Sequence, residues 1–281
     1  MKKSIKMLSG LVAFTLIGTI LWFANGFLGN PISRAIANNS ARKYIETNYP
    51  NMKLEVSEVS YSFKDGNYHA YIKSPTSKDT HFSVNISPLG KVGYDSYEDE
   101  VVKKYNTYTR ISELYNSKVK DAFESEDCPY KSDINFGELK EKSLNDSSDE
   151  YEEFGPKYGL DISKLELDKD YNIEQLGKMY GHIVLYIQIE DVNIKKASEI
   201  LLDIKDILDN KNISFYAIDF TIEKSLEEGE KSNNKNKSIS MQQFLYNDIY
   251  EDGLENRVEE ACDNLEKYYK KQDKIKENEV K

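Results

Sequence analysis

Residues 54–73 read LEVSEVSYSFKDGNYHAYIK, and this stretch decides the fold of the N-terminal half. Apolar and polar residues alternate over 52–56 and again over 59–63, as in strands with one buried face. The phase of the alternation changes at Ser57-Glu58, which predicts a β-bulge or a bend, because a slip of one residue turns the buried face outward. The turn signal Lys64-Asp65-Gly66-Asn67 then predicts an antiparallel hairpin.

Two more strands complete the predicted sheet. After a polar loop over 74–80, the alternation returns over 82–86. A turn at 87–90 leads to a short strand over 92–94. We therefore expect an antiparallel meander.

A helix is expected to precede this meander. Asn30 is a typical N-cap residue, and Pro31 suits the first helical position. Apolar residues recur at helical spacing up to Ile45. Tyr49-Pro50 ends the pattern, because the residue before a proline avoids the α region. This helix should cover the apolar face of the sheet.

The N-terminal segment has the composition of a membrane-spanning helix. No charged residue occurs between Lys6 and Arg34, and residues 7–28 are long and apolar enough for a bilayer. Three lysines precede them, which places the N-terminus in the cytoplasm. We expect a transmembrane signal-anchor. The alternatives are a cleaved signal peptide, whose apolar core is normally ~7–15 residues, and a buried soluble helix.

A long helix and an acidic stretch follow the meander. One apolar stripe predicts a helix over 97–125. The run 145–153 holds five acids and no base, as in a solvated linker. The predicted parts are thus a signal-anchor (1–28), a helix-plus-meander domain ending in a long helix (29–127), an acidic linker (128–159) and a second domain (160–281).

The second domain is predicted to be a β-α-β-β-α type unit, so that the fold class is α+β throughout. Residues 183–189 have the apolar character of a buried strand, and residues 194–208 repeat apolar positions at helical spacing. The other expected elements are strands over 165–167, 213–222 and 239–244, and a charged helix over 255–276.

Composition and charge narrow the function classes. Of the 281 residues, 39% are hydrophobic and 12% aromatic, which excludes a disordered chain. The net charge of −11 argues against nucleic acid and against an anionic lipid surface as the partner. Cys128 and Cys262 are too few for a disulfide scaffold. They could pair outside the cytoplasm, or Cys262 could be a small core residue.

Neither a metal site nor a catalytic residue is assigned. A symmetric 74–80 loop pairs the flanking strands in one register: His69 with Asn85, Tyr71 with Ser83, and Lys73 with His81. The histidines then lie roughly 13 Å apart at ~3.3 Å per residue, too far to share a metal ion. Asp168-x-Asp170-x-Asn172 begins like an EF-hand loop, but Ile173 and Met179 stand where Gly and Glu are needed. No nucleotide-binding or nucleophile motif occurs, and no cofactor is expected.

Tyrosines are frequent in the region of the predicted sheet. A tyrosine offers a large contact area with few rotatable bonds, which suits recognition of a protein or peptide. Strand propensity alone is the other explanation. The candidate binding surface consists of Tyr61, Tyr68, Tyr71, Tyr94 and Tyr97.

Several short stretches look familiar: 29–33 (GNPIS), 41–45 (ARKYI), 59–68 (VSYSFKDGNY), 74–82 (SPTSKDTHF), 90–92 (GKV) and 94–97 (YDSY). Together they resemble the YfjL-like proteins, uncharacterised membrane-anchored proteins of Gram-positive bacteria. The resemblance is strongest over 29–97 and extends to the rest through the two-domain layout. It implies a bacterial surface protein and supplies no catalytic residue. The helix-plus-meander is also similar in topology to PepSY-type and cystatin-like modules.

The sequence therefore predicts a single-pass cell-membrane protein with a cytoplasmic N-terminus and two extracytoplasmic α+β domains. Its expected role is that of a non-catalytic binding or regulatory module, which contacts an envelope protein or peptide through a sheet edge or tyrosines. The alternatives are a carboxylate-dependent envelope hydrolase and a structural subunit of an envelope complex.

Overall fold

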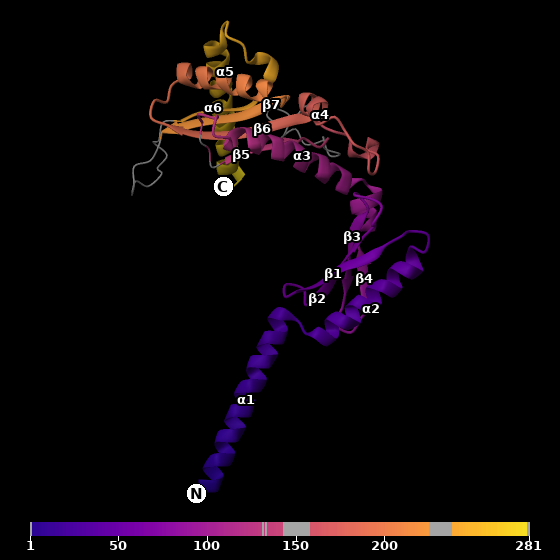
Figure 1. Ribbon diagram of the computed structural model, residues 1–281. Coiled ribbons are helices and arrows are strands. Elements are labelled where there is room, and N and C mark those ends of the chain that lie inside the picture. The colour runs from indigo at the N-terminus through magenta and orange to yellow at the C-terminus, as the bar shows by residue number, and fades with distance from the viewer. Residues whose placement is uncertain (1, 131, 133, 143–157, 225–237, 280–281) are drawn as a thin grey trace. The chain divides into compact units, whose positions relative to one another are not determined.

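The computed structural model describes residues 2–130, 132, 134–142, 158–224 and 238–279. Its contacts divide the chain into two compact units. The first comprises residues 1–107 and 165–169, and the second comprises residues 108–164 and 170–281. Each unit contains one four-stranded sheet with helices, so the α+β class is confirmed (Figure 1).

The N-terminal helix α1 (Lys2–Leu28) begins with three lysines in its first five residues and is uncharged and largely apolar from residue 7 onward. Its most apolar 18-residue stretch has a mean hydropathy of 1.9, and no residue of that stretch is buried. Phe14, for example, is 82% exposed. The helix is thus long and apolar enough to cross a membrane, and a signal sequence would have the same character.

Helix α2 (Pro31–Asn48) begins and ends where the sequence predicts. The Asn30 side-chain oxygen accepts a hydrogen bond from the Ser33 amide at 2.8 Å, which caps the helix. Ala37, Ala41 and Ile45 are buried against the sheet. The two small alanine side chains let the helix approach the strands closely.

The first sheet is the predicted meander, with strand order β1-β2-β3-β4. Its register shifts between Val56 and Glu58, which confirms the expected bulge. The predicted pairing of the β2 and β3 strands is also confirmed, including Tyr71 opposite Ser83. The strands are β1 (Glu55–Ser62), β2 (Asn67–Lys73), β3 (His81–Ile86) and β4 (Val92–Asp95).

The helix predicted over 97–125 is divided in two. A π-helical turn at Glu98–Val102 is separated from α3 (Tyr105–Glu124) by Lys104, whose φ of 66° is incompatible with a continuous right-handed helix. The unit boundary also falls inside α3, at residues 107/108, and not at the predicted 127/128.

The second sheet has strand order β5-β6-β7-β8, with β6 and β7 parallel and the outer pairs antiparallel. The strands are β5 (Ile134–Leu139), β6 (Gly181–Ile189), β7 (Ala217–Lys224) and β8 (Ser238–Leu245). Besides most of α3, the helices of this unit are α4 (Ile173–Tyr180), α5 (Ile194–Asn210) and α6 (Leu254–Glu279). The unit is therefore mixed, and α4 is an element that the sequence reading missed.

Two further predictions need correction. Residues 165–167 form no strand, and β5 lies inside the range 128–159 that the sequence indicates as a linker. β5 exists because β6 supplies a full antiparallel ladder to it, a partner more than forty positions away in the sequence. The acidic run 145–153 lies outside the described residues. Cys128 and Cys262 are free thiols.

Candidate functional site

The face of the first sheet that points away from α2 is polar. Alternation along a strand sends every second side chain to this face, because successive residues point in opposite directions. Cross-strand pairing then arranges these side chains in three rows: Glu55–Lys73–His81, Glu58–Tyr71–Ser83 and Ser60–His69–Asn85.

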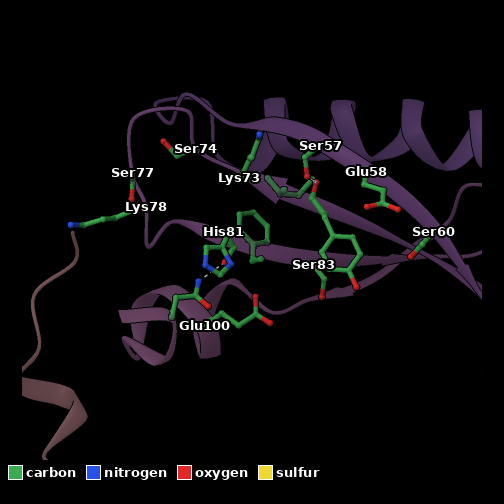
Figure 2. A pocket seen from close by; sticks show the side chains of 14 residues that line it. Ser57, Glu58, Ser60, Lys73, Ser74, Ser77, Lys78, His81, Ser83 and Glu100 are labelled. Carbon is green, nitrogen blue, oxygen red and sulfur yellow. Dashed lines mark hydrogen bonds between the residues drawn. The ribbon is translucent and has the colours of Figure 1, made fainter. Parts of the chain in front are cut away.

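A groove of about 890 Å³ runs over this face. Figure 2 shows its side chains on three strands, with Glu58 and Ser60 from β1, Lys73 from β2, and His81 and Ser83 from β3. Glu100 of the π-helical turn also lines it. Most lining side chains are polar, and both signs of charge are present. The complete lining is Ser57, Glu58, Ser60, Tyr71, Ile72, Lys73, Ser74, Ser77, Lys78, His81, Phe82, Ser83, Glu100 and Asn106.

Tyr71 is the large exposed aromatic side chain of the groove. It is 50% exposed and lies between Glu58 and Ser83 in the middle row. The bulged Ser57 donates a hydrogen bond from its hydroxyl to the Tyr71 carbonyl at 3.0 Å. Lys73 Nζ lies 3.3 Å from Glu55 Oε1, and both side chains are about half exposed. Solvent screens this pair, so the ammonium can exchange partners at little cost.

The loop at one end of the groove is held by a buried carboxylate. Asp79 is fully buried, and its Oδ2 accepts hydrogen bonds from the Thr107 hydroxyl at 2.9 Å and the Asp168 amide at 2.8 Å. The Asp79 amide donates in return to Asp168 Oδ1 at 3.0 Å. Asn106 Nδ2 donates to the carbonyls of Asp79 and His81 at 3.0 and 2.6 Å. These bonds pre-organise the groove.

The other end of the polar face carries a hydrogen-bonded aspartate. Asp65 Oδ2 accepts from His69 Nε2 at 3.1 Å and from Asn85 Nδ2 at 3.2 Å. Hydrogen bonds from the Ser62 side chain, the Asn67 amide and His69 together lower the pKa of Asp65 to about 2. This carboxylate is therefore charged over the physiological range.

The structure separates the five tyrosines of the predicted surface. Tyr71 lines the groove, and Tyr94 is 63% exposed on β4 outside the groove lining. Tyr68 is 1% exposed, so it belongs to the core. Tyr97 is half-buried, with its ring centroid 4.7 Å from Tyr49. Tyr61 donates its hydroxyl hydrogen to the Gly26 carbonyl at 3.1 Å.

A polar cluster in the second unit escaped the sequence reading. His182 is fully buried, and its Nδ1 lies 2.9 Å from the Tyr158 hydroxyl. Its Nε2 lies 3.2 Å from Asp219 Oδ2, an ion-pair distance without hydrogen-bond geometry. Burial raises the pKa of the Tyr158 hydroxyl, and the Asp219 charge adds to the effect. The three residues of this cluster are far apart in the sequence, and their spacing matches no known motif. Sequence patterns alone could therefore not bring them together.

Within the described part of the chain, no group of three or more His, Cys, Asp or Glu side chains is placed to hold a metal ion. Asp168, the first residue of the EF-hand-like stretch, has a structural role. Asp168 adopts a φ of 62° and accepts a hydrogen bond from the Ser77 hydroxyl at 2.9 Å. Its carboxylate is thus used to hold the loop beside the groove.

Two protein-family models match the chain. One describes a YfjL-like N-terminal domain and matches residues 2–96, and the other describes a YfjL-like C-terminal domain and matches residues 114–259. The chain belongs to the YfjL-like family. The resemblance noted in the sequence is therefore confirmed and covers both units. The groove of this YfjL-like protein lies in the N-terminal domain, apart from Glu100 and Asn106.

One solved structure matches this YfjL-like chain at low sequence identity. It is the crystal structure of a DUF5037 family protein from Ruminococcus gnavus ATCC 29149, with 11% identity over 79% of this chain and 98% of that chain. The TM-score of 0.24 is too low to support an argument about fold or function. No curated protein sequence matches.

Proposed function

We propose that this YfjL-like protein is anchored in the cell membrane by α1 and binds a protein or peptide outside the cytoplasm through the groove of its first unit. The anchor is supported by the exposed apolar surface of α1. The orientation is supported by the lysines at positions 2, 3 and 6, because positive charge is retained on the cytoplasmic side.

The observation that carries the binding role is the pre-organised polar groove around Tyr71. Small-molecule pockets of this size are usually lined by apolar side chains. Here the lining offers hydroxyls, Glu58 and Lys73 beside a half-exposed aromatic ring. Such a surface suits an extended polar peptide, whose backbone and charged side chains need hydrogen-bonding partners. Because Asp79 and Asn106 already hold the loop, little ordering cost remains for binding.

The edge strand β1 favours a peptide that lies across the face rather than one that extends the sheet. β1 and β4 are the edge strands of this sheet, and an added strand would pair with the outer edge of one of them. The bulge between Val56 and Glu58 in the β1–β2 ladder distorts β1, and β4 is only four residues long with a register shift in its own ladder, so neither edge offers a long regular template. We therefore place the ligand on Tyr71 and not along the edge.

The alternative of a carboxylate-dependent hydrolase needs an acid whose environment alters its proton affinity within a cleft. The acids that line the groove are Glu58, which is exposed, and Glu100, which is half-buried. Solvent contact of this kind suits a binding residue better than a general acid. The binding role is the stronger proposal for this reason.

A peptide-display library tests the groove. Purified full-length protein in detergent micelles would be panned against random peptides, and enriched peptides would be titrated against variants. Tyr71→Ala should weaken binding by about tenfold or more, the size expected for an aromatic hot spot. Tyr94→Ala is the matched control, since Tyr94 is also exposed but does not line the groove. Equal losses for both variants, or none, would refute the groove as the site.

Protease treatment of intact cells tests the orientation. A tag at the C-terminus should be lost while a cytoplasmic control protein stays intact. Protection of the tag until the cells are lysed would place both units inside and overturn the proposed location.

A further inference from the structure

Exposed apolar side chains gather at the end of the first unit from which α1 emerges. The β1–β2 and β3–β4 turns lie at the same end of the sheet, because Tyr68 pairs with both Tyr61 and Ile86. Each turn carries one large apolar residue that points to solvent. Phe63 is 60% exposed, and Leu89 is 89% exposed.

The ends of both helices lie beside these turns. The rings of Phe27 in α1 and Phe63 have centroids 6.0 Å apart. The β3–β4 turn lies against α2, since a Cβ at Gly90 would be 2.7 Å from the Ile36 side chain. Ile32, in the first turn of α2, is 72% exposed. The apolar side chains of this end therefore form one group around the exit of α1, although each would be unremarkable alone.

Hydrogen bonds fix α1 to this end of the unit. The Tyr68 hydroxyl accepts from the Asn30 amide at 2.8 Å and donates to the Asn30 carbonyl at 3.0 Å. Tyr61 reaches the Gly26 carbonyl, and the Asn30 side chain donates to Asn25 Oδ1 at 3.0 Å. The junction is thus a fixed connection and not a free linker. A membrane that contains α1 must meet the turns beside it.

The charges at this end are basic, in contrast to the chain as a whole. Arg34, Lys64 and Lys91 are exposed in the first turn of α2 and in the two hairpin turns. The nearby acid Asp65 already accepts hydrogen bonds from His69 and Asn85. Basic side chains beside apolar ones match a bilayer interface, where phosphates lie above acyl chains.

We propose that the first unit docks on the outer surface of the membrane through a collar of Ile32, Phe63 and Leu89, with Arg34, Lys64 and Lys91 on the lipid phosphates. This inference rests on the proposed anchoring by α1. The 74–80 loop lies at the opposite end of the sheet from the turns. The docked domain therefore holds the loop end of the groove away from lipid, where a peptide can reach it.

Tryptophan quenching tests the collar in the full-length protein. The chain has one tryptophan, Trp22 in α1. The protein would be reconstituted in vesicles of phosphatidylethanolamine and phosphatidylglycerol with bromine on the upper acyl chain, which quenches nearby indoles. Phe63→Trp and Leu89→Trp would each be made in a Trp22→Phe background. Thr76→Trp, at an exposed position of the 74–80 loop, is the matched control.

Docking predicts strong quenching for Phe63→Trp and Leu89→Trp, and at most a few per cent for Thr76→Trp. If all three indoles show the same low quenching while Trp22 of the unaltered protein is quenched, the anchor stands and the collar is wrong. If Trp22 itself is not quenched, α1 does not lie in the bilayer, and both proposals fail. Circular dichroism of each variant excludes a folding defect.

Charge reversal provides a second, independent measurement. In the Leu89→Trp protein, Lys64→Glu with Lys91→Glu should reduce quenching at least twofold, because repulsion from phosphatidylglycerol lifts the turns. The same pair of changes should have less effect in vesicles of phosphatidylcholine alone. Unchanged quenching in both lipids would remove the electrostatic part of the proposal.

Discussion

The two sheets of this protein differ in how far each strand lies from its partner in the sequence. In the first sheet every strand pairs with its neighbour in the chain, and the order is β1-β2-β3-β4. In the second sheet β5 and β6 are separated by α4 and the preceding segment, and β6 reaches its parallel partner β7 only through α5. Because its strands pair locally, the first sheet can be predicted from the sequence, whereas the second depends on contacts between distant residues.

The two sheets also differ in the burial and polarity of their faces. The first sheet buries one face under α2 and leaves the other polar and open. The second buries a run of side chains on β6 and β7, among them Ile187 and Phe220, and its His182 is fully buried while the partners of His182 are half-buried. The open face is therefore the better candidate for recognition, and the second sheet for stability.

The largest expected effect comes from the core of the second sheet. Phe220 is fully buried, so Phe220→Ala should lower the free energy of unfolding of the second unit by about 3–5 kcal/mol. Calorimetry should show one shifted transition and one unchanged, if each sheet organises its own core. A common shift of every transition would show that the two units unfold together.

The next effect tests the junction of the first unit. Tyr68→Phe removes the hydroxyl that serves both the amide and the carbonyl of Asn30. We expect a loss of about 1–3 kcal/mol in urea unfolding, the cost of unpaired half-buried polar groups. Tyr94→Phe is the control, because Tyr94 is 63% exposed. A similar loss in both variants would contradict the special role of Tyr68.

A smaller effect concerns pH. The pKa of Asp65 is lowered to about 2 in the folded state, from an ordinary value of 3.8. Its contribution to stability is therefore complete above pH 3.8 and disappears as the pH falls toward 2. In Asp65→Asn, this part of the acid dependence should be absent, with a difference below about 1 kcal/mol at neutral pH because the group is screened. Urea unfolding at pH 2.5, 4 and 6 measures it, and parallel curves would disprove the assignment.

The smallest effect on stability is expected in the groove. Lys73 and Glu55 form an exposed pair, so Lys73→Ala should change the free energy of unfolding by less than about 0.5 kcal/mol. The same change should weaken binding of a groove-selected peptide several-fold. A large loss of stability with no loss of binding would show that Lys73 has a structural role. The first sheet would then serve stability at this position, against the recognition role proposed for it.

The first sheet and its helix could be predicted because each signal is local. Asn30 caps the helix that follows it, Gly66 takes the positive φ of its turn, and the phase change at Ser57 marks the bulge. The pairing of Tyr71 with Ser83 followed from the length of one loop. The interactions behind these features join residues that are close in the sequence. The sequence by itself therefore determined these features, together with the apolar N-terminal helix.

The remaining features required the tertiary structure. β5 is a strand because β6 lies beside it, and a Cβ at Gly137 would lie only 2.5 Å from Val119 of α3. Residues 165–169 join the first unit through the reciprocal bonds of Asp79 and Asp168, which are 89 positions apart. Tyr68 and Tyr71 are both strand tyrosines, yet one is core and the other lines the groove. Which face a helix covers is settled by packing, and packing depends on residues that no local pattern connects.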